Sequence, residues 1–374
     1  MKISKKDALA WFEFLAQLPE GEQLMVKQQE LVYAVFAQIE TAVIKRNAEL
    51  MAKIPGLKTL EHRTFFVGPD DKFPGGCRSC LLGSGLTAIR KTNKCNLQCK
   101  FCYNYGELDA IAPVGEGIWV IGGTKFYEQD LDLLLAIHQK PTGVAYVYLE
   151  PFMEIEKYYN VIRRFRQAGI YQHLYTNGTL ATETTLKALG EAGLDELRFN
   201  LGASGCADNV IENIGIAKKY IKKVGIETPM TPELFEKFFV KKQAILATGL
   251  DFINCAELHL NANNIDNYMG EKMYIARHGY ISPIWSRELT LRFMAIAANE
   301  QWDLVVHDCS NDTKFARDLN LGAKEGKWFG ASSYTSEFLE IPYAVFLPVL
   351  RDDAFRFEIE EELPNGYKPG EMLF

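Results

Sequence analysis

Three cysteines lie close together in the segment KTNKCNLQCKFCYNYGE, at Cys95, Cys99 and Cys102. Their spacing is C-x3-C-x2-C, and Phe101 directly precedes the last of them. Thiolates are soft ligands that favour iron–sulfur clusters or zinc over magnesium or calcium. Three thiolates on a [4Fe–4S] cluster leave one iron open, and such an iron can bind a small molecule and pass it an electron. The triplet therefore predicts a [4Fe–4S] cluster.

The elements that must position these cysteines begin at residue 86. Apolar strand candidates alternate with amphipathic helices, which implies a parallel sheet with helices outside it. The expected strands are 86–91, 143–150, 171–176, 195–201, 223–228 and 251–260, and the expected helices are 128–139, 154–168, 181–193, 209–222, 232–247 and 284–299. The predicted fold class is α/β, with residues 86–320 forming a partial (β/α)6 TIM-like barrel. A further strand at 303–307 and a helix near 312–319 extend it.

The segments on either side of this barrel have a different character. Ser4 and Asp7 fit a capping box that opens one helix, and a second helix is expected from 22 to 51. Residues 54–85, with several Gly and Pro, are expected to be irregular. Residues 1–85 are therefore expected to form a helical N-terminal extension followed by an irregular segment that contains Cys77 and Cys80. The tail from Ile341 contains AVFLPVL and FRFEIEEEL, which predict a β-hairpin or small appendage within 321–374.

The cysteine triplet follows the first expected strand, at its C-terminal end. Active sites of parallel α/β barrels lie on that rim, so the position and the chemistry agree. In this place CNLQCKFC resembles the signature of the radical S-adenosylmethionine (SAM) superfamily. The resemblance implies that the open iron binds SAM, that one electron cleaves it, and that the resulting 5′-deoxyadenosyl radical abstracts hydrogen from a small molecule or a peptide side chain. It also implies oxygen sensitivity and an electron donor such as flavodoxin or ferredoxin.

Further residues carry the same resemblance. The second strand ends in YLEP, where Glu150 and Pro151 are similar to the end of the family's Gly-Gly-Glu-Pro segment, although both glycines are missing. The resemblance implies that the SAM site is formed by Phe101, Glu150, Pro151, Thr176, Asn177, Asn200 and Glu227. On the sixth strand Glu257 and His259 alternate onto one face. They are the candidate catalytic residues.

A second group of cysteines surrounds this core. Cys77 and Cys80 lie upstream in PGGCRSCLLGSG, and Cys309 lies downstream in VVHDCSNDT. With FINCAEL of the sixth strand, these segments resemble a branch related to pyruvate formate-lyase activating enzymes. One hypothesis is that the three thiols meet, with His307 or Asp308 nearby, and hold a second iron–sulfur cluster or a zinc ion. The alternatives are a redox dithiol at Cys77 and Cys80 or inert buried thiols.

The net charge, the apolar runs and the cysteine count limit the classes of partner and the cellular location that we expect. The 374 residues carry a net charge of −7, which argues against a binder of nucleic acid. No 18-residue apolar run and no signal peptide core occur, so we expect a cytoplasmic protein without a membrane span. Eight cysteines are too few for a secreted disulfide scaffold of this length.

Two other functions remain open at this point. One is an activase that installs a glycyl radical on a partner enzyme. The other is a non-enzymatic iron–sulfur carrier or zinc-stabilised module, although zinc sites usually have a fourth Cys or His at a recognisable spacing. Glu150, Pro151 and the series of strands favour an enzyme over the carrier.

Overall fold

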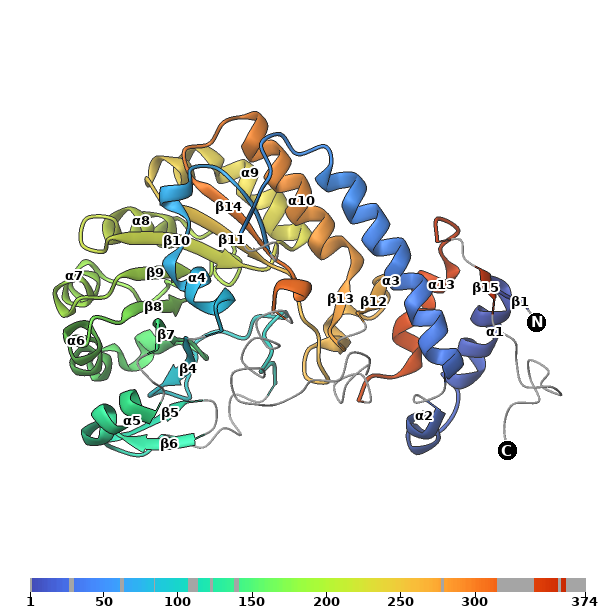
Figure 1. Ribbon diagram of the computed structural model, residues 1–374, viewed down its shortest axis with the longest axis horizontal. Coiled ribbons are helices and arrows are strands. Elements are labelled where there is room, and N and C mark those ends of the chain that lie inside the picture. Colours follow the sequence, from blue (N-terminus) through green and yellow to red (C-terminus); the bar gives the residue numbers. More distant parts are fainter. Residues whose placement is uncertain are drawn as a thin grey trace.

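A single curved sheet dominates the computed structural model, which describes residues 2–26, 30–60, 64–83, 85–106, 114–121, 124–137, 141–276, 279–314, 340–355 and 358–360 (Figure 1). Its eleven strands have the order β2-β3-β14-β11-β10-β9-β8-β7-β4-β5-β6. Their bounds, in chain order, are β2 Lys58–Leu60, β3 Thr64–Val67, β4 Leu86–Arg90, β5 Ile118–Ile121, β6 Thr124–Tyr127, β7 Gly143–Tyr146, β8 Tyr171–Thr176, β9 Glu196–Phe199, β10 Lys223–Thr228, β11 Phe252–Ala256 and β14 Val305–Cys309.

The central strands, from β14 to β4, are parallel to one another. Antiparallel pairs continue the sheet at both ends: β2 and β3 beside β14, and β5 and β6 beside β4. The order of the described strands is linear, so the sheet curves without closing. The predicted α/β class and partial barrel are confirmed, and all six expected strands plus the one near 303–307 are present.

Helices cover the outer face of this sheet (Figure 1). They are α5 Leu131–Ile137, α6 Tyr159–Gln167, α7 Glu183–Ala192, α8 Asp208–Ala217, α9 Pro232–Ala247 and α10 Ile284–Asn299. Outward side chains such as Val144, Leu174 and Leu197 are fully buried beneath them. Because the strand period is two, the intervening residues face the inner side. Several of these are polar, among them His173, Glu196 and Arg198.

The segment expected to be irregular, 54–85, is ordered where the structure describes it. It forms β2, β3, the 3-10 turn η1 Asp70–Lys72 and the helix α4 Gly75–Leu81. Helix α4 packs on β7 and β8 from the inner side. A Cβ atom at Gly76 would lie 2.6 Å from both Arg198 Nη2 and His173 Nδ1, so only glycine allows this approach.

Arg198 joins α4 to the inner face of the sheet. Its guanidinium is 98% buried, and Nε and Nη2 face the carboxylate of Glu196. Nη1 donates to Tyr175 Oη at 3.0 Å and to the Glu227 carboxylate, and Nη2 donates to Cys77 Sγ at 3.4 Å. The guanidinium therefore donates four hydrogen bonds and is paired with the carboxylates of Glu196 and Glu227, which compensate its buried charge.

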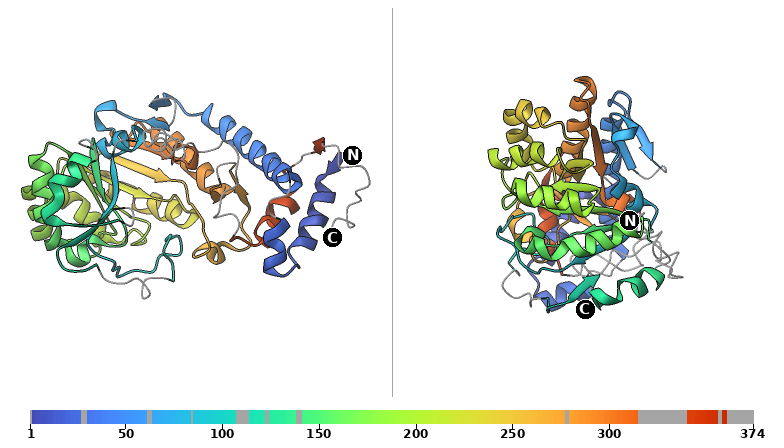
Figure 2. Two further views of the ribbon diagram at one scale, coloured as in Figure 1. Left: turned by 60° about the horizontal axis from the view of Figure 1, so that its bottom comes forward. Right: turned by 90° about the vertical axis from the view of Figure 1, so that its left-hand side faces the viewer.

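A second core lies beside the sheet (Figures 1 and 2). It contains β1 Lys2–Ser4, α1 Lys5–Leu15, α2 Glu20–Val26, α3 Glu30–Met51, β12 Met273–Ile275, β13 Ile281–Pro283, η5 Tyr343–Phe346, α13 Leu347–Arg351 and β15 Glu358–Glu360. The capping box of Ser4 and Asp7 is present at the start of α1. Helices α2 and α3 cover the helix expected over 22–51 on either side of residues 27–29, which lie outside the described residues. Helix α3 runs from this core to α10.

The expected hairpin in the tail is wrong for the described residues. AVFLPVL forms η5 and α13 instead, because a continuous apolar run suits a buried helix as well as a buried strand. Strand β15 pairs with β1, antiparallel, at the other end of the sequence. The domain boundary at 320 and most of the helix expected near 312–319 lie outside the described residues. In the described part of the chain, no helix is long and apolar enough to span a membrane.

Replacing Arg198 by Met should lower the free energy of unfolding by about 3–5 kcal/mol, because Glu196 and Glu227 would stay buried without their counter-charge. Urea denaturation of purified protein measures this. The control is Arg166→Met, which removes an exposed arginine that pairs with Asp195 at 3.1 Å, and should cost about 1 kcal/mol or less. Equal losses in the two variants would contradict the role given to Arg198.

Candidate active site

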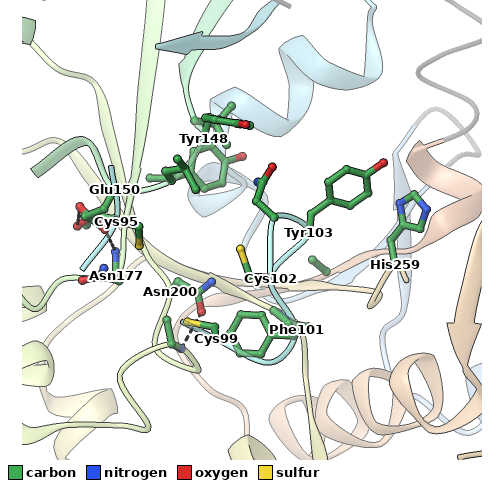
Figure 3. A pocket seen from close by; sticks show the side chains of 18 of the residues that line it. Cys95, Cys99, Phe101, Cys102, Tyr103, Tyr148, Glu150, Asn177, Asn200 and His259 are labelled. Atoms are coloured by element: carbon green, nitrogen blue, oxygen red, sulfur yellow. Dashed lines mark hydrogen bonds between the residues drawn. The ribbon is translucent and has the colours of Figure 1, made fainter. Parts of the chain in front are cut away.

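The three clustered cysteines line one cavity of about 560 Å³ at the C-terminal ends of the parallel strands (Figure 3). Parallel α/β sheets bind their ligands at this edge. The residues around the cavity come from the cysteine loop and from the ends of β7 to β11. They are Cys95, Cys99, Phe101, Cys102, Tyr103, Asn104, Val147, Tyr148, Leu149, Glu150, Tyr175, Thr176, Asn177, Asn200, Ala203, Pro229, Ala256, Glu257, Leu258 and His259.

The three cysteine thiols are partly buried around one cavity. Burial raises the pKa of all three thiols, that of Cys99 to about 12, and Cys102 and Cys95 add to the shift at Cys99. Thiols with such pKa values keep their protons until a metal displaces them. Three thiolates around one cavity are a ligand set that a [4Fe–4S] cluster can take.

The backbone of the cysteine loop is held by four asparagines that follow β11. Together we call them the asparagine clamp. Their side-chain amides donate to the carbonyl oxygens of residues 100, 101 and 103, at 2.9–3.4 Å. The four are Asn261, Asn263, Asn264 and Asn267, of which Asn267 lies in the 3-10 turn η4 Ile265–Tyr268. These bonds fix where the loop presents its thiols.

Asn264 is the buried centre of the clamp. Its side chain is fully buried, and Oδ1 accepts a hydrogen bond from Asn261 N at 2.9 Å. Its Nδ2 donates to the carbonyls of Phe101 at 3.4 Å and His259 at 3.3 Å. The sequence analysis did not single out the clamp. The available signal was four asparagines within seven residues, NANNIDN, directly after a strand of the site.

The other side of the loop is tied to the turn after β8. Asn96 exchanges side-chain hydrogen bonds with Asn177 and Thr179, both at 2.8 Å. Thr179 N and Oγ1 also donate to Asn177 Oδ1, at 3.0 and 2.6 Å. Asn177, a predicted site residue, therefore lines the cavity and also braces the loop.

Glu150 is a buried acceptor at the edge of the cavity. Its Oε2 accepts from Asn177 N at 2.6 Å, and its Oε1 accepts from Thr176 Oγ1 at 2.7 Å and from Phe152 N at 3.0 Å. Burial raises the pKa of this carboxyl to about 7, and the three hydrogen bonds only partly oppose that shift. An ionisable carboxyl facing a cavity suits an amino group of a ligand.

The two residues before Glu150 have left-handed backbones. Tyr148 has φ of 106° and Leu149 has φ of 53°, which glycine adopts freely and other residues adopt at a cost of about 1–3 kcal/mol each. Tyr148 and Leu149 stand at the positions of the two glycines in the Gly-Gly-Glu-Pro segment with which YLEP was compared. The Arg90 guanidinium lies 3.8 Å from the centre of the Tyr148 ring.

The remaining predicted cofactor residues divide into two groups. Asn200 and Phe101 line the cavity; Asn200 Oδ1 accepts from Ala203 N at 3.0 Å, and Phe101 also packs on the second core. Pro151 and Glu227 are outside the lining. Pro151 begins the 3-10 helix η3 Pro151–Tyr158, and Glu227 is paired with Arg198.

The two candidate catalytic residues reach the cavity in different ways. Both carboxylate oxygens of Glu257 are engaged, with Tyr274 Oη at 2.5 Å and with Asn311 N at 2.7 Å, so this side chain holds neighbouring segments together. His259 packs among aromatic rings, with centroids 5.4 Å from Tyr103 and 4.4 Å from Tyr280.

The second cysteine group lies on the inner side of the sheet, around the end of α4. Cys77 is buried and accepts hydrogen bonds from Arg198 and, at 3.7 Å, from Asn254 Nδ2. Burial raises the pKa of Cys309 to about 12, with a smaller contribution from Cys80. His307 and Asp308 have other partners: His307 Nε2 bonds with Thr64 Oγ1 at 2.7 Å, and Asp308 faces Arg287 at 3.3 Å.

Comparisons with known proteins agree with this geometry. Residues 89–238 match the radical SAM superfamily. A protein of Methanocaldococcus jannaschii, provisionally described as a glycyl-radical enzyme activating enzyme, is 26% identical over 206 residues, 52% of each chain. A tungsten-containing aldehyde ferredoxin oxidoreductase cofactor-modifying protein of Pyrococcus furiosus is 25% identical over 185 residues, 43% of this chain and 48% of that one. The chain spans about half the length of the curated relatives it matches.

Among solved structures, SuiB of Streptococcus suis bound to its precursor peptide SuiA aligns over 61% of this chain and 48% of its own. The sequence identity is 13% and the TM-score is 0.42. SuiB bound to S-adenosylmethionine aligns over 61% of this chain and 50% of its own, with 12% identity and a TM-score of 0.42.

Replacing Asn264 by Ala should destabilise the protein by about 1–3 kcal/mol and lower the iron retained after anaerobic reconstitution and gel filtration, because buried partners lose their hydrogen bonds. The control is Gln172→Ala. Gln172 is another fully buried amide, bonded to Ile162 O at 2.9 Å and Tyr146 Oη at 2.8 Å on the outer face of the sheet. The Gln172→Ala variant should lose stability to a similar degree and keep its iron. Iron loss that follows stability equally in both variants would argue against the clamp.

Proposed function

We propose that this chain, an enzyme that carries a radical SAM domain, reductively cleaves SAM and modifies a small molecule or a peptide side chain. The observation that carries the proposal is one cavity, at the C-terminal strand ends, lined by Cys95, Cys99, Cys102 and Glu150. A [4Fe–4S] cluster held by the three cysteines would supply one electron, which would cleave a C–S bond of SAM into methionine and a 5′-deoxyadenosyl radical able to abstract hydrogen from the substrate.

The predicted site residues have distinct roles in this proposal. The three cysteines would hold the cluster, and the asparagine clamp would keep their loop in place. Glu150 would accept from the amino group of SAM, held by Thr176 and Asn177. Asn200 and Phe101 would border the nucleoside. Pro151 and Glu227 would act through the backbone and through Arg198 rather than by contact.

A second candidate is an activase that installs a glycyl radical on a partner enzyme. The observation that favours it is the similarity to the relative from M. jannaschii described as an activating enzyme, over about half of each chain. A glycyl-radical electron paramagnetic resonance signal on a co-purified partner would decide for this candidate. For either reaction we propose flavodoxin or ferredoxin as the electron donor, in the reducing cytoplasm.

The decisive test of the enzymatic proposal is SAM cleavage. Reduced, iron-loaded protein incubated with SAM without oxygen should form 5′-deoxyadenosine, measured by liquid chromatography. Cys99→Ala should abolish this product and the bound iron, whereas Cys206→Ala, a buried cysteine outside both groups, should keep both. An intact cluster without any SAM cleavage would leave an electron carrier as the better account.

The iron content tests the second cysteine group. We propose a single cluster, with Cys77, Cys80 and Cys309 left as thiols without a metal, and therefore about four irons per chain after reconstitution. A content near eight, or bound zinc by elemental analysis, would favour the alternative in which these three thiols bind a second cluster or a zinc ion.

SAM affinity should fall by about tenfold between pH 8 and pH 6. The pKa of Glu150 is raised to about 7, so the carboxyl is ionised above this pH and accepts from the amino group, and it is mostly protonated at pH 6. Equilibrium dialysis of iron-loaded protein measures the affinity. Glu150→Gln should bind SAM more weakly and keep its iron. Its remaining pH dependence reports the titration of SAM itself, and a profile equal to that of the wild type would refute the assignment.

A further inference from the structure

We propose that the part of the cavity bordered by the rings of Tyr148, Tyr103 and His259 is a substrate subsite, and that Tyr148 positions a planar, uncharged group there. This inference rests on the proposed function, because it assumes that SAM occupies the end near Glu150 and Asn177. Figure 3 shows these two residues with Cys95 on one side of the cavity, and Tyr103 and His259 on the other.

Tyr148 enters the cavity because of its backbone. It and Leu149 form a consecutive left-handed pair, and both line the cavity. Glycine would relieve the strain at this place but would leave no side chain. Strain that persists beside a cofactor site indicates a functional contribution from the side chain. The ring is also fixed from behind, because the Arg90 guanidinium stacks on it at 3.8 Å.

Two other segments bring rings to the same cavity. Tyr103 directly follows the last cysteine, and its carbonyl is held by the clamp residues Asn261 and Asn263, both at 3.1 Å. His259, beyond β11, lies 5.4 Å from Tyr103, centroid to centroid. The subsite therefore has walls from the end of β7, from the cysteine loop and from the segment after β11.

The charges around the cavity define the class of ligand. The described lining contains no Lys or Arg, so a phosphate or carboxylate group would find no cation to pair with. The Glu257 carboxylate accepts from Tyr274 Oη and Asn311 N, and its charge is partly compensated by the nearby Arg287 guanidinium. Arg90 on one face of the Tyr148 ring weakens the attraction of a second cation to that ring. A flat, neutral group is what these surfaces accommodate.

The test compares two ligands with the same carbon skeleton, planar p-cresol and puckered 4-methylcyclohexanol. Isothermal calorimetry on anaerobic, iron-loaded, SAM-bound protein should show p-cresol binding at millimolar concentrations, roughly three- to tenfold tighter than 4-methylcyclohexanol. Tyr148→Phe should keep this preference. Tyr148→Gly, which suits the left-handed backbone and therefore should fold, should lose it.

Gln301→Gly is the matched control, because Gln301 also has a left-handed backbone, with φ of 53°, and it is absent from the cavity lining. It should keep the preference. Equal affinities for the two ligands, no binding of p-cresol, or a preference that survives in Tyr148→Gly would each overturn the subsite. The proposed function is judged separately, by 5′-deoxyadenosine from the wild type, so either idea can fail while the other stands.

Discussion

A charge removed from water must have every one of its donors matched, and the guanidinium of Arg198 imposes this constraint on the inner side of the sheet. Its acceptors come from α4, β8, β9 and β10. Helix α4 is therefore held on the inner side of the sheet, where it packs on β7 and β8. The cavity lies beyond it, at the C-terminal ends of the strands. Hydrogen bonds that are shared among several elements make such a network stiff. Tyr175, which belongs to the network and also lines the cavity, is thus held in a fixed position.

The reactive end of the molecule is built from irregular backbone rather than from helix or strand. The cysteine loop has its carbonyls held by the asparagine clamp on one side and its Asn96 held by the turn after β8 on the other. The left-handed pair before Glu150 stores strain at the same rim. Such a site needs a rigid support, because no ladder of hydrogen bonds fixes its geometry. The sheet and the second core provide that support from opposite directions.

Sequence reasoning succeeded where the information is local. The helices α9 and α10 and the strands β8 and β10 follow from periodicity and end signals within a few residues. The cysteine triplet and Glu150 were predicted from short motifs; the structure places them around one cavity, and their roles stay predictions. Sequence reasoning failed where distant residues decide: α4 forms in a segment expected to be irregular, where Gly76 lies directly against Arg198 and His173. Glu227, predicted at the cofactor, is paired with Arg198, because β9 and β10 place the two residues on the same face. The helical tail was missed because its apolar run has no period.

The clamp on the cysteine loop also sets a chemical lifetime. Asparagine is among the side chains that heat degrades, by hydrolysis of the amide to a carboxylate. At Asn263, whose bond to the Tyr103 carbonyl is exposed, this change would turn a donor into a negatively charged acceptor facing an oxygen. Attraction would become repulsion without any change in the number of atoms in contact. The loop that carries the thiols would then lose its exposed hydrogen bond at Asn263 first. The buried amide of Asn264 would remain protected from water.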